Sequence, residues 1–266
     1  MKPAAFEYHS PRSVEEAIEL LGDEMVESRV IAGGQSLVPM MNFRLAVPEA
    51  LVDLRRIDDL HYLRVAADGA LEVGARTTQA ELLRDPRVGE GWPLLAAGVA
   101  QIGHPQVRSR GTVCGSLAHH DPHGELPALA VALDATIELA GPEGRRSVAA
   151  DDFFVSFYEV AIEPGEMVVA VRFPAPPAGS GWAFREIARR RGDFALVGVA
   201  CLVGAGATRL VVFGAAERPL LLGAVEEVEA AVQPVDDLHA SAEYRREAAV
   251  GLAREALAEA RERAVA

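Results

Sequence analysis

Apolar residues recur at helical spacing in several segments of the chain. In SVEEAIELL, Val14, Ala17 and Leu21 fall on one helical face, and Ser13 has the side chain of a good N-cap. This pattern predicts an amphipathic helix from Ser13 to Leu21. The same reasoning predicts further helices over residues 78–83, 92–102, 126–135, 223–232 and 241–264.

Shorter apolar or alternating runs predict β-strands. The run Ala70 to Ala75 alternates apolar and polar residues, as a half-buried strand does. The other predicted strands cover residues 29–32, 50–54, 136–140, 167–173, 195–203 and 210–215. The strands do not alternate regularly with helices as in a doubly wound sheet, so the predicted fold class is α+β.

A connector rich in proline, glycine and serine divides the chain. The segment FPAPPAGSG, residues 173–181, suits a link between two units better than a helix or strand. We therefore expect two domains, covering residues 1–174 and 178–266.

Composition and charge exclude several classes of protein. The chain has 266 residues, 50% of them hydrophobic, and a formal net charge of −13, which disfavours binding to nucleic acid. Its two cysteines, Cys114 and Cys201, are too few for a four-cysteine zinc site or an all-cysteine iron–sulfur cluster. The N-terminus lacks the apolar stretch of a secretory signal and the apolar run 195–207 is too short to span a bilayer, so we expect a cytoplasmic protein without a membrane span.

The first segment with candidate chemistry is Ala32-Gly33-Gly34-Gln35-Ser36-Leu37, which follows a predicted strand. Adjacent glycines allow positive φ and close approach of backbone N–H groups to an anion, and Ser36 adds a hydroxyl. A diphosphate fits such a nest. The alternative is a plain glycine turn between strand and helix. The segment matches neither GxGxxG nor the P-loop pattern.

The second segment runs from Arg110 to Glu125 and is expected to be a loop. It offers small residues and hydroxyls for approach to a ligand, together with acceptors suited to sugar or ribityl hydroxyls: Gly111, Thr112, Gly115, Ser116, Asp121 and Glu125. A metal site is an open alternative, because its imidazoles and carboxylate lie close in sequence: His119, His120, Asp121 and His123. A surface loop whose histidines meet solvent or backbone is another alternative.

The third segment is the basic turn from Arg189 to Phe194. Its arginines are suited to a phosphate or an acidic partner, and Phe194 to covering a planar ring; the alternative is a solvated turn with one core aromatic. The chain has no GxSxG motif, and Cys114 is interpreted as a small filler in a glycine turn. No catalytic nucleophile is predicted.

Taken together, these segments resemble a known family. The chain is similar to the FAD-binding medium subunits of aerobic carbon monoxide dehydrogenases and to the flavin domain of xanthine dehydrogenases and related molybdenum hydroxylases. Four segments carry the resemblance in the family order: AGGQSLVPMMNFRLAVPEALVDL from Ala32, GHPQVRSRGTVCGSLAHHDPHGELPAL from Gly103, RRRGDFALVGVA from Arg189, and HASAEYRR from His239.

The resemblance implies an FAD site. The first glycine loop is implied to hold the diphosphate, the second to wrap the cofactor, Glu125 to meet the polyol chain, and Ile102 and Phe194 to cover the isoalloxazine. Here Cys114 replaces a family glycine, which predicts backbone strain at positive φ. The implied cofactor-binding residues are Ala32, Gly33, Gly34, Gln35, Ser36, Leu37, Ile102, Gly111, Thr112, Cys114, Gly115, Ser116, Asp121, Glu125 and Phe194.

The resemblance also implies a fold. Residues 1–174 resemble a bipartite FAD-binding domain of the vanillyl-alcohol-oxidase (PCMH-like) type, and residues 178–266 resemble a small α+β domain with a three-stranded sheet and helices. FAD is expected in the cleft between them.

The implied function is that of an oxidoreductase component. A large partner subunit oxidises the substrate at a molybdenum-pterin centre, a small partner passes electrons through [2Fe-2S] clusters, and FAD in this chain delivers them to NAD⁺ or another acceptor. The implied assembly is a dimer of heterotrimers. Two alternatives stay open, a self-sufficient flavin oxidoreductase of the same superfamily and a flavin-free scaffold subunit.

Overall fold

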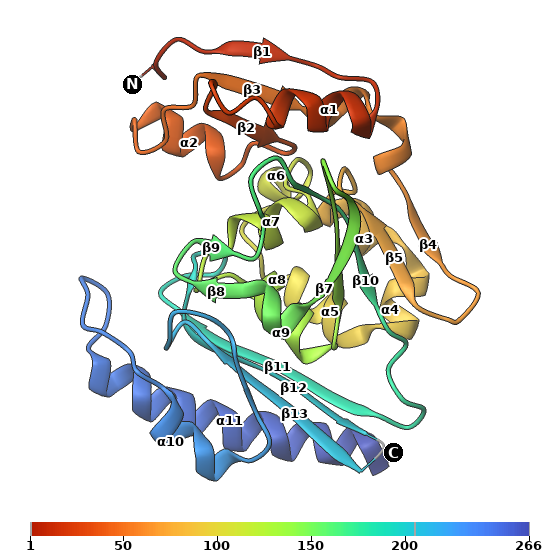
Figure 1. Cartoon of the computed structure of the whole chain (residues 1–266). Coiled ribbons are helices and arrows are strands. Elements are labelled where there is room, and N and C mark those ends of the chain that lie inside the picture. Colours follow the sequence, from red (N-terminus) through yellow and green to blue (C-terminus); the bar gives the residue numbers. More distant parts are fainter. Residues whose placement is uncertain (1, 205, 266) are drawn as a thin grey trace.

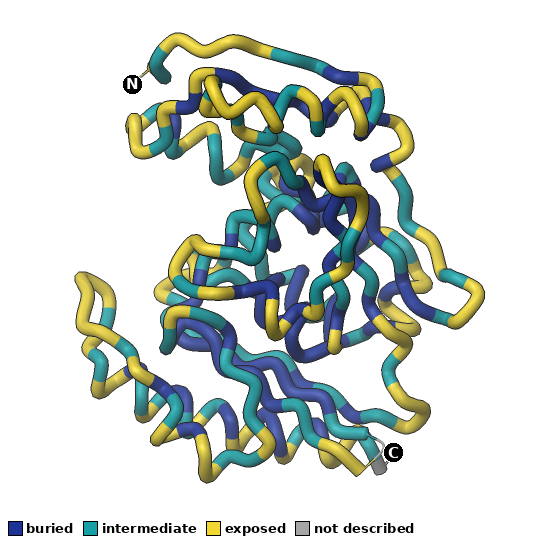
Figure 2. Tube along the Cα trace, viewed as in Figure 1, coloured by how far each residue is buried: buried dark blue, intermediate teal, exposed yellow. Residues whose placement is uncertain are grey.

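Three lobes follow one another from the N-terminus to the C-terminus in the computed structural model, which describes residues 2–204 and 206–265 (Figure 1). We call them the N-terminal lobe (residues 2–60), the central lobe (61–173) and the C-terminal lobe (181–265). The fold is α+β, as predicted. The most continuous buried stretches lie in the central lobe and in the strands of the C-terminal lobe beside it (Figure 2). Across the described ranges, no helix has the length and apolar character needed to cross a bilayer.

The N-terminal lobe is a small three-stranded parallel sheet in the order β1-β3-β2, with a helix in each crossover. Ser13 caps the first helix, because its Oγ accepts a hydrogen bond from the Glu16 amide at 3.1 Å. Strands and helices thus alternate regularly here, contrary to the expectation from sequence. The elements are β1 (Glu7–His9), α1 (Val14–Leu21), β2 (Ser28–Ile31), α2 (Leu37–Asn42) and β3 (Ala50–Asp53).

The central lobe combines a five-stranded antiparallel sheet, order β4-β5-β10-β6-β7, with a helical layer. Its helix α8 is buried along its whole length. The strands are β4 (Leu63–Val65), β5 (Leu71–Gly74), β6 (Thr136–Gly141), β7 (Gly144–Ala149), β8 (Phe154–Ser156), β9 (Glu159–Val160) and β10 (Met167–Phe173). The helices are α3 (Gln79–Arg84), α4 (Pro86–Gly91), α5 (Pro93–Val99), α6 (Pro105–Arg108), α7 (Val113–His119), α8 (Glu125–Ala132) and α9 (Ala150–Phe153).

The C-terminal lobe has a four-stranded antiparallel sheet, order β11-β12-β13-β14, instead of the expected three strands. The short strand β14 has too few residues to show a strand pattern in the sequence. The predicted helix over 223–232 is also wrong, because a 3-10 turn (Val225–Glu227) precedes a single helical turn there. The elements are β11 (Gly181–Ala188), β12 (Ala195–Gly204), β13 (Ala207–Phe213), β14 (Leu220–Leu222), α10 (Val228–Ala231) and α11 (Ala242–Val265).

Both faces of the C-terminal sheet are covered. Helix α11 packs on β11 and β12, and helix α8 of the central lobe packs on β12 and β13. This explains the nearly continuous apolar sequence of β12, because a strand buried on both sides has no polar face.

A buried arginine connects α11 to the sheet. Arg245 is 2% exposed and donates hydrogen bonds to the carbonyl oxygens of Leu196 (2.6 Å) and Gly214 (3.2 Å) and to the carboxylate of Asp237 (2.6 Å). Burial alone would raise the pKa of Asp237, but hydrogen bonds from the His239 and Ala240 amides and from the arginine lower it to about 2. The guanidinium therefore stays paired at neutral pH.

Candidate functional site

A pocket of about 1210 Å³ lies between the N-terminal and central lobes. Among the described residues of the C-terminal lobe, only Gly192, Asp193 and Phe194 line it, so the pocket does not lie mainly between the two predicted domains as expected. Every site residue named from the sequence lines it: Ala32, Gly33, Gly34, Gln35, Ser36, Leu37, Ile102, Gly111, Thr112, Cys114, Gly115, Ser116, Asp121, Glu125 and Phe194.

The first glycine loop presents a row of free amides to this pocket. Within the described part of the chain, the N–H groups of residues 33–37 donate to no protein acceptor. Gly34 has φ +71°, a left-handed conformation that suits glycine, and Gln35 Nε2 donates to the Gly33 carbonyl at 3.3 Å. Successive unpaired amides in a turn make a concave site for an anion.

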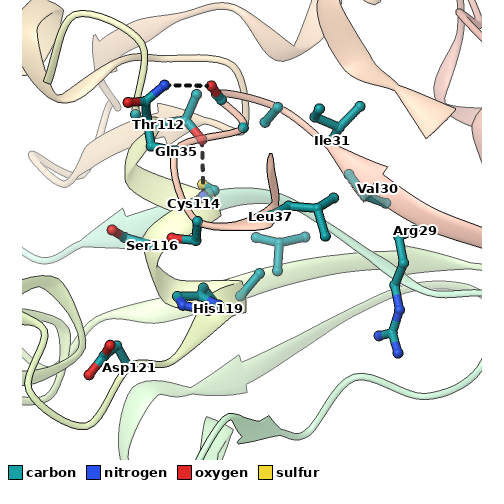
Figure 3. A pocket seen from close by; sticks show the side chains of 18 of the residues that line it. Arg29, Val30, Ile31, Gln35, Leu37, Thr112, Cys114, Ser116, His119 and Asp121 are labelled. Atoms are coloured by element: carbon teal, nitrogen blue, oxygen red, sulfur yellow. Dashed lines mark hydrogen bonds between the residues drawn. The ribbon is translucent and has the colours of Figure 1, made fainter. Parts of the chain in front are cut away.

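The two glycine-containing segments touch each other. A Cβ placed on Gly33 would lie 2.1 Å from the Arg110 carbonyl oxygen and 2.9 Å from the Gly111 Cα. Only glycine allows this approach. The two bends therefore form one continuous wall of the pocket (Figure 3).

The second segment is helical from Val113 to His119, where a loop was expected, and residues 120–124 form the expected loop. Thr112 is the N-cap of α7, with its Oγ1 accepting from the Gly115 amide at 3.1 Å, and a Cβ on Gly115 would lie 2.6 Å from that oxygen. Cys114 lies inside this helix and does not have a positive φ, so the expectation of backbone strain at this residue is wrong. The helix removes the strain because any residue type adopts its backbone angles.

The histidines of this segment contact backbone carbonyls or an aromatic ring of the protein. His120 ends α7 in the left-handed conformation, with Nδ1 3.1 Å from the Glu159 carbonyl, and His123 Nδ1 lies 2.8 Å from the Ala195 carbonyl. The ring of His119 lies against that of Tyr158, with centroids 5.3 Å apart. Burial lowers the pKa of His119 and of His120. In residues 2–204 and 206–265 no group of three His, Cys, Asp or Glu side chains is placed to hold a metal ion.

Tyr158 and Gln79 are among the pocket residues that the sequence reasoning missed. Tyr158 donates to Asp121 Oδ2 at 3.2 Å, and burial is the first cause that raises its pKa to about 12. Gln79 is 2% exposed; its Nε2 donates to Ser116 Oγ at 3.3 Å, and its Oε1 is buried without a partner. The sequence held one signal for Gln79: it is a polar residue at the start of a helix that the Thr78 capping box fixes.

Part of the basic turn lines the pocket, namely Gly192, Asp193 and Phe194. A Cβ on Gly192 would lie 2.6 Å from the His104 ring, so the turn packs closely on the segment after Ile102. The carboxylate of Asp193 pairs with Arg190 (3.2 Å) and Arg189 (3.6 Å). Phe194 lines the pocket and is 61% exposed, so it is not the core aromatic of the alternative interpretation.

Comparison with known proteins decides the family. Residues 4–176 match the model of the FAD binding domain in molybdopterin dehydrogenase. The chain belongs to this family of FAD-binding subunits. It is 37% identical to the carbon monoxide dehydrogenase medium chain of Afipia carboxidovorans, over 99% of each chain. It is also 37% identical to subunit alpha of the 6-hydroxypseudooxynicotine dehydrogenase complex of Paenarthrobacter nicotinovorans, over 99% of this chain and 97% of that one.

Solved structures agree with this family. The chain superposes on the carbon monoxide dehydrogenase of Hydrogenophaga pseudoflava with a TM-score of 0.94 at 36% identity, covering 99% of both chains. It matches quinoline 2-oxidoreductase from Pseudomonas putida 86 with a TM-score of 0.92, also at 36% identity and covering 100% of both chains. This protein is thus an FAD-binding medium subunit of the molybdenum hydroxylase type, a component of an oxidoreductase.

The thiols of this FAD-binding subunit are structural. Burial raises the pKa of Cys114 and of Cys201 to about 12, and Cys114 Sγ lies 3.6 Å from the Val73 carbonyl as a weak donor. We expect no reaction of the native chain with the thiol reagent DTNB at pH 8 and two reactive thiols after unfolding in guanidinium. One thiol that reacts rapidly in the native chain would show that its burial is wrong.

Proposed function

We propose that FAD in this chain passes electrons from [2Fe-2S] clusters of a small partner subunit to a terminal acceptor, while a large partner oxidises the substrate at a molybdenum-pterin centre. The observation that carries the proposal is the run of free amides at Gly33 to Leu37, held against the second glycine segment in one pocket. All-cysteine ligation of one [2Fe-2S] cluster needs four cysteines, and this chain has two, both buried and free. This supports the proposal that the clusters lie on another chain.

The residues of the pocket fit an FAD molecule. The amides from Gly33 to Leu37 would bind the diphosphate. The hydroxyls of Ser36, Thr112 and Ser116 line the same pocket and would donate hydrogen bonds to the cofactor. Glu125 would face the polyol chain, with Ile102 and Phe194 beside the ring. Bound FAD supplies a carrier of one or two electrons, and the protein supplies binding and orientation.

Domain limits and assembly complete the proposal. We place the FAD-binding domain at residues 1–174 and the C-terminal domain at 178–266; strand β10 ends at Phe173 and β11 begins at Gly181, which supports a boundary in the connector. The medium-chain relatives support a complex with a large and a small subunit, and we propose a dimer of heterotrimers in the cytoplasm. The acceptor is proposed to be NAD⁺ or another electron acceptor.

Absorption spectroscopy of the purified chain tests this function. We expect flavin bands after reconstitution with FAD, slow reduction by candidate organic substrates alone, and fast reduction by the same substrates once the co-encoded large and small subunits are added. Fast turnover by the isolated chain would instead show a self-sufficient flavin oxidoreductase. Failure to bind FAD at all would show a scaffold subunit.

A further inference from the structure

Two carboxyl groups without a counter-charge lie in the wall between the pocket and the C-terminal lobe. Glu125, the first residue of α8, lines the pocket and is only 4% exposed. Its side chain forms no ion pair or hydrogen bond with another residue of the described ranges. Glu186 on β11 has a buried Oε2 with no hydrogen-bond partner. Buried carboxyls are normally paired with a cation or a donor, so this wall departs from the rule.

Strand geometry directs Glu186 toward the central lobe. Successive side chains of a strand point to opposite faces, so Glu186 shares a face with Phe184 while Arg185 lies on the other. Arg185 pairs with Glu259 of α11 at 2.8 Å on that other face. The guanidinium of Arg185 therefore points away from Glu186.

Packing places the two carboxyls near each other. A Cβ on Gly98 would lie 2.7 Å from a Leu129 methyl and 3.0 Å from the Phe184 ring, so these two side chains meet beside α5. Glu125 lies one helical turn before Leu129, about 6 Å along α8, and Glu186 lies two residues beyond Phe184, about 7 Å along β11. The charge of Glu186 acts on Glu125.

All acidic neighbours act in the same direction. Burial, the largest cause, acts together with the charges of Glu186 and of Asp121 to raise the pKa of Glu125 to about 8, although a hydrogen bond from the residue's own amide opposes the shift. Burial raises the pKa of Glu186 to about 7. Two like carboxyls that interact lose their protons in two steps that belong to the pair.

We propose that Glu125 and Glu186 form a buried carboxyl pair, and that Glu186 is a positioning residue that keeps the proton on the Glu125 carboxyl toward the cofactor. The inference rests on the proposed placement of FAD in this pocket. A protonated Glu125 donates a hydrogen bond to a ligand hydroxyl and adds no negative charge near the diphosphate. Glu186 achieves this without touching the ligand, since it does not line the pocket.

Titration of the FAD-free chain tests the pair directly. With glutamate labelled at the side-chain carboxyl carbon, the NMR signal lost in Glu125→Gln identifies Glu125. In Glu186→Gln we expect its midpoint to fall by about one pH unit, because the neighbouring charge is gone. The control is Glu229→Gln, which removes an exposed charge on α10 and should leave the midpoint unchanged. An unchanged midpoint in Glu186→Gln, with a normal thermal unfolding curve, would overturn the proposal.

FAD affinity measured against pH gives the second readout. FAD affinity should fall above pH about 8, where Glu125 ionises in the free chain. If bound FAD raises the pKa of Glu125 by one unit, the total loss of affinity should be about tenfold. In Glu186→Gln the weakening should begin about one unit lower, and in Glu125→Gln it should disappear. Identical profiles for the native chain and Glu186→Gln would contradict the pair. If the native chain binds no FAD, the proposed function fails, while the carboxyl titration still decides the inference.

Discussion

Gly33→Ala is expected to yield a folded protein that no longer retains FAD. The new Cβ would lie 2.1 Å from the Arg110 carbonyl oxygen, so the two bends must separate and the row of free amides must move. Overpacking of this kind costs about 1–3 kcal/mol, which corresponds to roughly 5- to 150-fold weaker binding if the cost falls on the bound state. The flavin absorbance of the purified protein and an FAD titration followed by fluorescence measure the effect.

The matched control for this prediction is Gly89→Ala. A Cβ on Gly89, in helix α4, has no heavy atom within 4 Å, so this substitution adds a methyl group to open space. We expect unchanged FAD content and a small gain in stability from the better helix propensity of alanine. Full FAD retention in Gly33→Ala would show that the contact between the bends does not shape the binding site.

Arg245→Met is expected to cause the largest loss of stability among simple substitutions. The change leaves the carbonyls of Leu196 and Gly214 without their donor and leaves Asp237 without its cation. The side chain of Asp237 is 38% exposed, so the cost comes mainly from the carbonyls that lose their donor, about 1–3 kcal/mol for each buried acceptor left unpaired. Urea unfolding followed by circular dichroism should show this as a lower midpoint with a similar slope.

Arg254→Met is the control on the same helix. Arg254 is exposed on α11, and substitutions at such positions usually change stability by less than about 0.5 kcal/mol. If the two variants unfold at the same urea concentration, the hydrogen bonds of Arg245 do not stabilise the fold. The comparison separates the buried network from a general effect of removing a positive charge.

Local sequence signals located the lining of the pocket correctly. The paired glycines Gly33 and Gly34 and the hydroxyl of Thr112 specify turns and caps that depend on a few neighbouring residues, so they can be recognised without the fold. The strand over 167–173 was predicted at its observed bounds because its residues are apolar except Arg172. Whether these residues bind FAD in the proposed roles is a prediction that the variants above test.

Features that depend on distant parts of the chain were not predicted. Strand β10 pairs with β5, whose residues lie about a hundred positions earlier, and this pairing carries Tyr158 and the segment after it to the pocket. Helix α7 was interpreted as a loop because Gly115 weakens a helical pattern, while the Thr112 cap and its bridge to Thr78 hold it in place. Backbone strain was wrongly expected at Cys114 for the same reason.

The complete burial of α8 has a consequence for synthesis of the protein. The strands that cover this helix, β12 and β13, end at Phe213, about 80 residues after the helix itself. At translation rates of about 5–20 residues per second, the apolar helix waits roughly 4–16 s on the ribosome before its cover emerges. Nascent chains paused in that interval should be the form of this protein that most needs a chaperone.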